Sequence, residues 1–258
     1  MRRKDMNPYT RNLNRIEFAV TYACTGRCKH CSEGEHKRQG EYIDGEAAAE
    51  AVYKTAEKYN MDSLMTFGGE PLLYPDVVCN IHKAGKEAGI PKRQLITNGF
   101  FSKENEKIRK VTEQLAWSGV NAVLLSVDAF HQETIPLDTV KVFAQAVKEA
   151  GIPVRTHPAW LGDQEQENKY NRKTKEILDV FSRMGIEPSE GNIIFPSGNA
   201  LTYLKEYFDP SAMPVNPYIE KEDDIRSICI GPDGTVLDGN IYQSDILGIL
   251  ERYEPSKN

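Results

Sequence analysis

The feature that most constrains the fold of this chain is a regular alternation of strand-like and helix-like segments. Short apolar stretches alternate with longer ones in which apolar residues recur every three or four positions. In 45–59, for example, Ala48, Ala51 and Val52 fall on one helical face, and Asp44 is in position to act as the N-cap. Repeated strand–helix units of this kind predict an α/β fold with a parallel sheet and helices on the outside.

The alternation divides the chain into at most six β/α units, the sixth without a clear helix. Glycines at the ends of three helices, Gly89, Gly151 and Gly185, are expected to be C-caps that stop each helix before the next strand. The predicted strands are 16–23, 63–69, 94–99, 122–128, 153–160 and 192–196. The predicted helices are 45–59, 75–88, 103–117, 137–149 and 171–183.

The last part of the chain does not continue this alternation. It is rich in proline, and Pro232-Asp233-Gly234 predicts a turn between apolar residues. A chain of 258 residues suits one large α/β domain with a small addition. We therefore expect an N-terminal segment at 1–15, a core domain at 16–200 and a small C-terminal extension at 201–258.

Composition restricts the classes of function. The formal net charge of -6 gives no indication of nucleic-acid binding. No apolar run approaches 18 residues, so no transmembrane helix and no membrane partner are expected. The five cysteines are an odd number, and no apolar run of signal-peptide length follows the basic N-terminus. We therefore expect reduced thiols and a cytoplasmic protein.

Three of the five cysteines lie within eight residues, at Cys24, Cys28 and Cys31, with the spacing C-x3-C-x2-C. A structural zinc site would need a fourth ligand, which His30 or His36 could supply, although its ligands usually come in two separated pairs. Three thiolates on one loop suit a [4Fe–4S] cluster in which one iron has no protein ligand. The loop follows the first predicted strand, and parallel α/β sheets bind ligands beyond the carboxyl ends of their strands.

This loop resembles the motif of the radical S-adenosylmethionine (SAM) superfamily, which follows the first strand of a partial (β/α)6, TIM-like barrel. The resemblance implies that Cys24, Cys28 and Cys31 bind three irons of a single [4Fe–4S] cluster, and that the amino and carboxylate groups of SAM bind the fourth. The family usually has an aromatic residue before the last cysteine. Here that residue is His30, which the resemblance places near the adenine of SAM.

Motifs at the later strand ends extend the resemblance, which covers about 16–200. TFGGEP (66–71) looks like the family's GGEP motif, in which strand-end backbone and a carboxylate meet the amino group of SAM. TNG (97–99) would otherwise be an ordinary turn, and FPSGNA (195–200) resembles P-x-G-R-A with Asn199 in place of arginine. The residues thereby expected to contact SAM, besides His30, are Gly68, Gly69, Glu70, Thr97, Asn98, Ser126, Asp128, Arg155 and Ser197. His157 is either a buried histidine or a substrate contact.

The C-terminal segment ICIGPDGTVLDGN (228–240) resembles the start of the SPASM or twitch extension of many peptide-modifying members. That extension holds an auxiliary cluster, but here no cysteine follows Cys229, so we expect a remnant without a cluster. Cys79 is expected to be a core residue. Cys229 is expected to be a packing residue, with the donation of a hydrogen atom to a substrate radical as the alternative.

The resemblance implies an enzyme that cleaves SAM reductively and uses the 5′-deoxyadenosyl radical to abstract a hydrogen atom from a substrate. It also implies an electron donor such as flavodoxin or ferredoxin. The C-terminal segment favours a peptide or amino-acid-like substrate. Two alternatives stay open: a member acting on a small molecule or nucleoside, and, from another class, a non-catalytic metal-binding protein.

Overall fold

The computed structural model describes residues 6–37, 39–211 and 214–256, and a six-stranded parallel sheet forms its centre. The strands are β1 (Arg15–Ala19), β2 (Ser63–Phe67), β3 (Lys92–Thr97), β4 (Ala122–Leu125), β5 (Val154–Thr156) and β8 (Ser227–Ile230). Their order is β5-β4-β3-β2-β1-β8, and every neighbouring pair is parallel. This arrangement is a partial TIM-like barrel, which confirms the predicted fold class.

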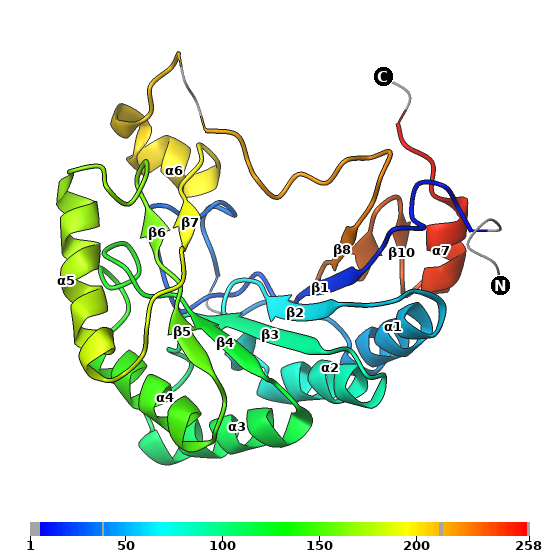
Figure 1. Ribbon diagram of the computed structural model, residues 1–258, viewed down its shortest axis with the longest axis horizontal. Coiled ribbons are helices and arrows are strands. Elements are labelled where there is room, and N and C mark those ends of the chain that lie inside the picture. Colours follow the sequence, from blue (N-terminus) through cyan, green and yellow to red (C-terminus); the bar gives the residue numbers. More distant parts are fainter. Residues whose placement is uncertain (1–5, 38, 212–213, 257–258) are drawn as a thin grey trace.

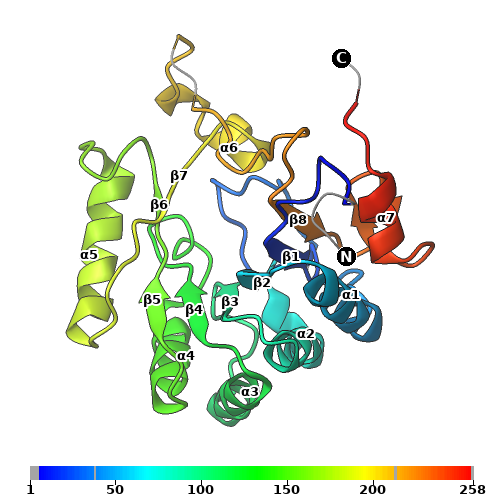
Figure 2. The same ribbon diagram turned by 45° about the vertical axis from the view of Figure 1, so that its right-hand side comes forward.

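The helices follow the strands as predicted, and the first five cover the convex side of the curved sheet (Figures 1 and 2). They are α1 (Gly45–Lys58), α2 (Pro75–Glu87), α3 (Asn105–Ser118), α4 (Leu137–Glu149) and α5 (Lys169–Arg183). Shorter helices follow at η2 (Pro71–Leu73), α6 (Gly198–Tyr203), η3 (Lys205–Tyr207) and α7 (Ile246–Arg252). Among the residues that the structure describes, no helix combines the length and apolar character needed to cross a membrane.

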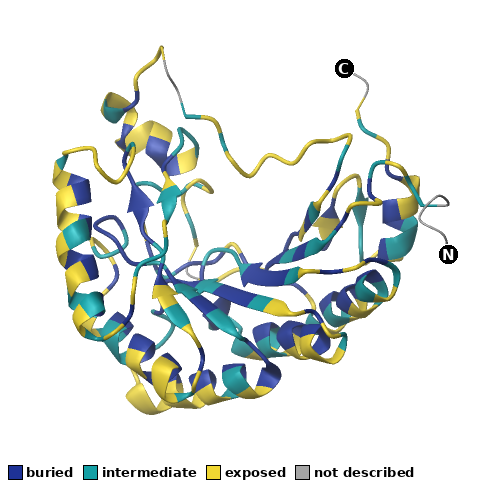
Figure 3. Ribbon diagram, in the orientation of Figure 1, coloured by how far each residue is buried: buried dark blue, intermediate teal, exposed yellow. Residues whose placement is uncertain are grey.

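Side-chain alternation along the strands separates the core from the concave face. Figure 3 shows that the helices are buried where they face the sheet and exposed on their outer sides. Ile16 of β1 and Leu64 of β2 are partners in register and are fully buried on the helix-covered side, where Leu64 lies against Gly85 of α2. The next residue of β1, Glu17, is in register with Met65 of β2 and with Cys229 of β8. Because neighbouring side chains in register share a face, these three lie on the concave side.

The fifth and sixth predicted strands differ from the observed ones. The stretch 153–160 divides into β5 and β6 (Ala159–Trp160), because Pro158 between them has no N–H to continue a ladder. The predicted sixth strand shortens to β7 (Asn192–Ile193), which pairs with β6 in a separate two-stranded sheet. The sixth strand of the main sheet is β8, from the C-terminal segment. The segment 201–258 therefore contributes to the barrel itself, and the boundary at 200 stays a prediction.

The five predicted helices are present with ends within two residues of the prediction, and the C-terminal turn is confirmed. The Asp44 carboxylate accepts hydrogen bonds from Glu46 N and Ala47 N, as an N-cap does. The three predicted C-cap glycines all have positive φ, between 69° and 76°. The turn at 232–234 connects β8 to the short hairpin of β9 (Thr235–Val236) and β10 (Gly239–Asn240).

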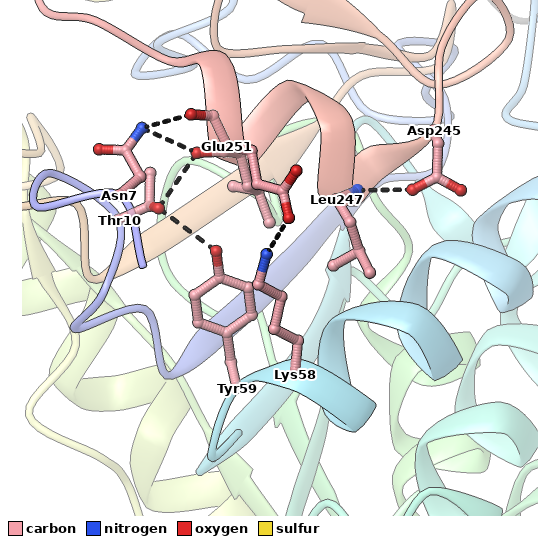
Figure 4. Close-up of polar contacts among 8 residues, drawn as sticks. Asn7, Thr10, Lys58, Tyr59, Asp245, Leu247 and Glu251 are labelled. Atoms are coloured by element: carbon pink, nitrogen blue, oxygen red, sulfur yellow. Dashed lines mark hydrogen bonds and ion pairs between the residues drawn. The ribbon is translucent and has the colours of Figure 1, made fainter. Parts of the chain in front are cut away.

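The N-terminal segment ties helix α7 to the rest of the fold (Figure 4). Asn7 Nδ2 donates to the carbonyl oxygens of Leu250, Glu251 and Tyr253, at 3.0, 3.2 and 2.8 Å. These carbonyls belong to the last turn of α7 and to its C-cap residue Tyr253, where helices leave carbonyl groups without partners. Lys58 at the end of α1 adds an ion pair with Glu251. The segment before β1 and the segment after β8 therefore stabilise each other.

We expect Asn7→Ala to lower the free energy of unfolding by about 1–2 kcal/mol, because it leaves carbonyls of α7 without their donor. Asn12→Ala is a matched control, since Asn12 Nδ2 donates to Asp224 Oδ1 at 2.8 Å in an exposed position. The control should change stability by about 0.5 kcal/mol or less. Urea unfolding followed by circular dichroism measures both, and equal losses in the two variants would contradict this role of Asn7.

Candidate functional site

The three clustered cysteines lie on one loop beyond the carboxyl end of β1. Cys24 and Cys28 are buried, Cys31 is half-buried, and all three are free thiols. The loop is closed at its base by Cys24 N, which donates to the carbonyl of Lys37 at 2.9 Å. Burial raises the pKa of the Cys24 thiol to about 12 and raises the pKa values of the other two. The thiols are therefore protonated in the metal-free protein, and binding a metal must release their protons.

The segment after β2 holds this loop through backbone contacts. Gly69 N donates to Thr21 O at 2.7 Å, and Glu70 N donates to Ala23 O at 2.8 Å. A Cβ atom added at Gly69 would lie 2.2 Å from Ala23 O, which is far closer than any contact allows. The close backbone approach predicted for Gly68 and Gly69 is therefore made to the cysteine loop. Both glycines also line the hollow beside the thiols, where contact with SAM stays a prediction.

Glu70 is completely buried and joins the ends of β2 and β3. Its carboxylate accepts from Leu72 N at 2.9 Å, Thr97 Oγ1 at 2.7 Å and Asn98 N at 2.8 Å. Burial outweighs these hydrogen bonds and raises the pKa of Glu70 to about 7. The Asn98 amide is thereby fixed close to the loop, where its Nδ2 donates to Thr25 Oγ1 at 3.2 Å. In the structure Glu70 positions Thr97 and Asn98, and its contact with SAM stays a prediction.

Asp128 is also completely buried, beyond the end of β4. Its Oδ1 accepts from Phe130 N and His131 N, both at 2.9 Å, and its Oδ2 accepts from Ala159 N at 3.0 Å and lies 2.8 Å from His131 Nδ1. The pKa of Asp128 is held below its ordinary value, because His131 and these hydrogen bonds outweigh the effect of burial. Ser126 lines the hollow with the cysteines, but Asp128 does not. Strand β4 ends at Leu125, so the alternation of side chains that would place Ser126 and Asp128 on the same face does not continue beyond it.

The last two predicted SAM-contact segments differ in their position relative to the cysteine loop. Arg155 is exposed and donates to the carbonyl of Pro188 at 2.9 Å, and it is not among the residues that line the hollow. The FPSGNA stretch, in contrast, packs against the cysteine loop, where Ser197 Oγ donates to Ser32 O at 3.0 Å. His157 Nδ1 lies 2.7 Å from Ser189 Oγ, so its half-buried ring has a protein partner.

Three residues near the thiols were missed or undervalued in the sequence. Asn199 Nδ2 donates to Cys28 O at 3.0 Å and Asn199 N donates to Cys31 O at 2.9 Å, so its side chain acts as well as its backbone. His131 lies with His30 and Cys28 so that ligand atoms of all three are within 4.8 Å of one another. The spacing of three between Asp128 and His131 was an available signal.

His36 is the third such residue. Its Nε2 lies 3.0 Å from Cys31 Sγ, and its Nδ1 lies 2.6 Å from the carbonyl oxygen of Tyr22. The Tyr22 carbonyl can only accept, so Nδ1 carries a proton and the ring orientation is fixed. His36 therefore supports the position of the Cys31 thiol.

The other two cysteines lie apart from the loop. Cys79 is half-buried and packs against the core, as predicted. Cys229, which was expected to be a packing residue, lies outside the core: its residue is exposed, while Ile228 and Ile230 on either side are buried. Cys229 lies on the concave face, where partial burial of the sulfur and the neighbouring Glu17 carboxylate raise the pKa of its thiol to about 12.

The donor set fits the cofactor that the sequence predicts. The thiols of Cys24, Cys28 and Cys31 border one hollow, and no other cysteine borders it among the described residues. Three thiols and no fourth match a [4Fe–4S] cluster with one iron open to an exchangeable ligand. The rest of the lining comes from strand-end and loop residues, which are Gly26, His30, His36, Gly68, Gly69, Ile96, Thr97, Asn98, Ser126 and His131.

Comparisons with known proteins agree with this assignment. A family model described as the Radical SAM superfamily matches residues 18–195. A curated relative from Saccharolobus solfataricus, "Probable GTP 3',8-cyclase", is 26% identical over 218 residues, which are 83% of this chain and 67% of the relative. A protein of the same name from Methanocaldococcus jannaschii is 29% identical over 126 residues, 48% of this chain and 40% of the relative. The chain thus spans two thirds or less of these relatives.

Solved structures show the same fold at lower identity. The structure described as Streptococcus suis SuiB bound to S-adenosylmethionine has a TM-score of 0.63 at 15% identity, covering 95% of this chain and 67% of that one. The structure described as native anSMEcpe with bound AdoMet has a TM-score of 0.57 at 12% identity, covering 90% of this chain and 76% of that one. At 15% and 12% identity, the similarity shows that the fold is shared and does not identify a substrate of this chain.

We expect the stability of the metal-free protein to depend on pH through Glu70. Its pKa rises from the ordinary 4.5 to about 7 on folding, so the folded protein keeps a proton that the unfolded chain releases. This proton stabilises the folded state fully below about pH 4.5. The stabilisation is lost as the pH rises to about 7, and above that pH the contribution of Glu70 to stability no longer changes.

The measurement compares wild type with Glu70→Gln by urea unfolding at several pH values. Between pH 4.5 and 7 the wild type should lose about 2–3 kcal/mol relative to the variant. Glu176→Gln, on the exposed face of α5, is the control and should give a difference that is constant with pH. A constant difference for Glu70→Gln as well would contradict the buried, proton-retaining state of Glu70.

Proposed function

The chain belongs to the radical SAM superfamily and is an enzyme, and from this premise we propose that it abstracts a hydrogen atom from a peptide or amino-acid-like substrate. The observation that carries the proposal is the gathering of three thiols at the carboxyl ends of parallel strands, where α/β barrels place their reactive groups. When bound there, a [4Fe–4S] cluster supplies the electron that cleaves SAM to methionine and the 5′-deoxyadenosyl radical.

The residues of the chain divide into those that hold the cluster and those that shape the SAM site. Cys24, Cys28 and Cys31 are the proposed cluster ligands. Gly68, Gly69, Thr97, Asn98, Ser126 and His30 are the proposed SAM contacts, because they line the same hollow as the thiols. Glu70 and Asp128 are proposed to act through the groups they hold, since all their described partners are protein donors. Ser197 is proposed to act by holding the cysteine loop.

The concave face supports a substrate without a large negative charge. Arg15 on this face is paired with Glu17, and Arg155 donates to the carbonyl of Pro188. A third cation, Lys92, lies at the amino end of β3, which is the end far from the cysteine loop. A nucleoside triphosphate would need several cations free to pair with its phosphates. A peptide or amino-acid-like substrate does not need such a group of free cations.

A guanine nucleotide is the second candidate substrate. One specific observation favours it: the curated relatives described above carry the name GTP 3',8-cyclase. The identities of 26% and 29% and the partial coverage of those proteins make this a weaker argument than the charges of the concave face. The two candidates are separated by experiment below.

Cys229 is proposed as the hydrogen-atom donor that quenches a substrate radical. Its thiol lies on the concave face, and a pKa raised to about 12 keeps the S–H bond intact at neutral pH. Donation breaks this S–H bond, forms a C–H bond on the substrate and leaves a thiyl radical, which an electron and a proton from the reductant restore. In D2O the exchanged thiol should place one deuterium at the product carbon, and Cys229→Ala should stop that transfer.

We expect Cys28→Ala to abolish formation of 5′-deoxyadenosine from SAM, because removing one of three thiolates destroys the cluster site. The matched control is Cys229→Ala, which removes a cysteine from the concave face and should keep the slow, substrate-free cleavage within about twofold of wild type. Reconstituted, dithionite-reduced proteins are compared by chromatography. Continued cleavage by Cys28→Ala would remove the cluster from the proposed chemistry.

We expect 5′-deoxyadenosine formation to be unchanged by GTP and to rise with the correct peptide. Short peptides encoded beside the gene are the first set to test, each with deuterium at its Cα positions. Transfer of deuterium into 5′-deoxyadenosine identifies the substrate directly, because the abstracted atom ends in that product. A rise with GTP, with deuterium transferred from deuterated GTP, would replace the peptide proposal by the nucleotide one.

A further inference from the structure

A group of exposed and half-buried cations lies beside the first bend of the cysteine loop. Arg27 and Lys29 come from the loop itself, and Lys169 and Lys173 come from the first turns of α5. Lys29, Lys169 and Lys173 surround one surface hollow, whose lining includes Gln132, Glu133 and Tyr170. We call these four cations the basic face.

The cations of the basic face are only partly neutralised. Lys29 Nζ lies 3.1 Å from Glu133, and Lys173 Nζ lies 2.9 Å from Glu176. Lys169 Nζ lies 4.9 Å from the centre of the Tyr170 ring, and the Arg27 guanidinium donates to the uncharged carbonyl of Cys24 at 2.8 Å. Glu206 also acts on Lys169, so three carboxylates face four cations and the face keeps a small net positive charge.

This positive face contrasts with the rest of the protein. The chain as a whole has a net charge of -6. The second bend of the cysteine loop, after Cys31, exposes two carboxylates, Glu33 and Glu35, and one cation, Lys37. An acidic protein approaching the cluster site is therefore repelled by the molecule overall and attracted at the basic face. Lys29 directly follows Cys28 and lies two residues before Cys31, so a partner docked here is close to two proposed cluster ligands.

We propose that the basic face is the docking surface of an acidic one-electron donor protein of the flavodoxin or ferredoxin class. The inference rests on the proposed function, because a radical SAM enzyme requires an electron donor. It adds the surface on which that donor binds and the charges that attract it. Complementary charges of this kind raise the rate of association more than the affinity, and salt weakens them.

The test measures how fast a purified acidic flavodoxin, reduced beforehand, passes an electron to the reconstituted protein in a stopped-flow instrument. The test variant is Lys169→Glu combined with Lys173→Glu, which lies on α5 and leaves the cysteine loop unchanged. The control is Lys83→Glu on α2, because Lys83 is also exposed and lies 3.9 Å from Glu87, one turn away. Dithionite, a small reductant that needs no docking surface, is applied to every protein, and binding of oxidised flavodoxin is measured separately.

At low ionic strength the test variant should react with flavodoxin at least about tenfold more slowly than wild type, and the control within about twofold. The wild-type rate should fall as salt is added, and the rate of the test variant should change little. The three proteins should react equally with dithionite.

Equal flavodoxin rates in wild type and test variant would overturn the proposal, as would a wild type that flavodoxin does not reduce. A matching loss with dithionite would assign the effect to the cluster and not to docking. Displacement of flavodoxin by a short RNA at constant ionic strength would reassign the face to nucleic acid. If flavodoxin binds as expected but SAM is not cleaved, the proposed function fails and the docking surface does not.

Discussion

The hydrogen bonds that fasten the backbone of the cysteine loop to two distant parts of the barrel determine where the three thiols lie. On one side Gly69 N and Glu70 N, just after β2, donate to the carbonyls of Thr21 and Ala23. On the other side Asn199, at the start of α6, donates to the carbonyls of Cys28 and Cys31 through its amide and its backbone. A loop held at both ends has lost most of its conformational freedom before any metal binds.

The buried carboxylates near the loop follow from the same constraint. Glu70 and Asp128 have no exposed surface, and protein donors surround both of them. A buried carboxylate is stable only when such donors are present, and once in place it fixes their positions. Glu70 thus holds Thr97 and Asn98 at the end of β3, and Asp128 holds His131 beside Cys28. The two carboxylates therefore hold neighbouring protein groups in place, and smaller side chains and backbone groups line the proposed cluster and SAM site.

Much of this architecture could be predicted from the sequence, and the failures have identifiable causes. Helix ends were predictable because caps such as Asp44 and the C-cap glycines are local. The pairing of β8 with β1 was not, because it joins segments about 200 residues apart and the sequence pattern of a short strand does not name its partner. The division of 153–160 could have been predicted from Pro158. The exposed position of Cys229 follows from the register of β8, which only the structure provides.

The same distinction applies to the site. The three cysteines and the GGEP segment could be recognised because their spacing is specific. The partners of Asp128 and the amide contact of Asn199 depend on loops that meet only in the folded chain, so sequence gave no more than the D-x-x-H spacing as a signal. Whether Glu70, Asp128 and Arg155 meet SAM directly stays a prediction, and the structure adds the protein groups with which each of them already interacts.

The central claim is that this loop, held from both sides, binds one [4Fe–4S] cluster with an iron open to SAM. The most direct test is to count iron and sulfide after anaerobic reconstitution and to record the electron paramagnetic resonance spectrum of the reduced protein with and without SAM. We predict about four irons and four sulfides per chain, and a spectrum that changes when SAM is added. The account would be contradicted by zinc in place of iron, by about eight irons per chain, or by a spectrum that does not change when SAM is added.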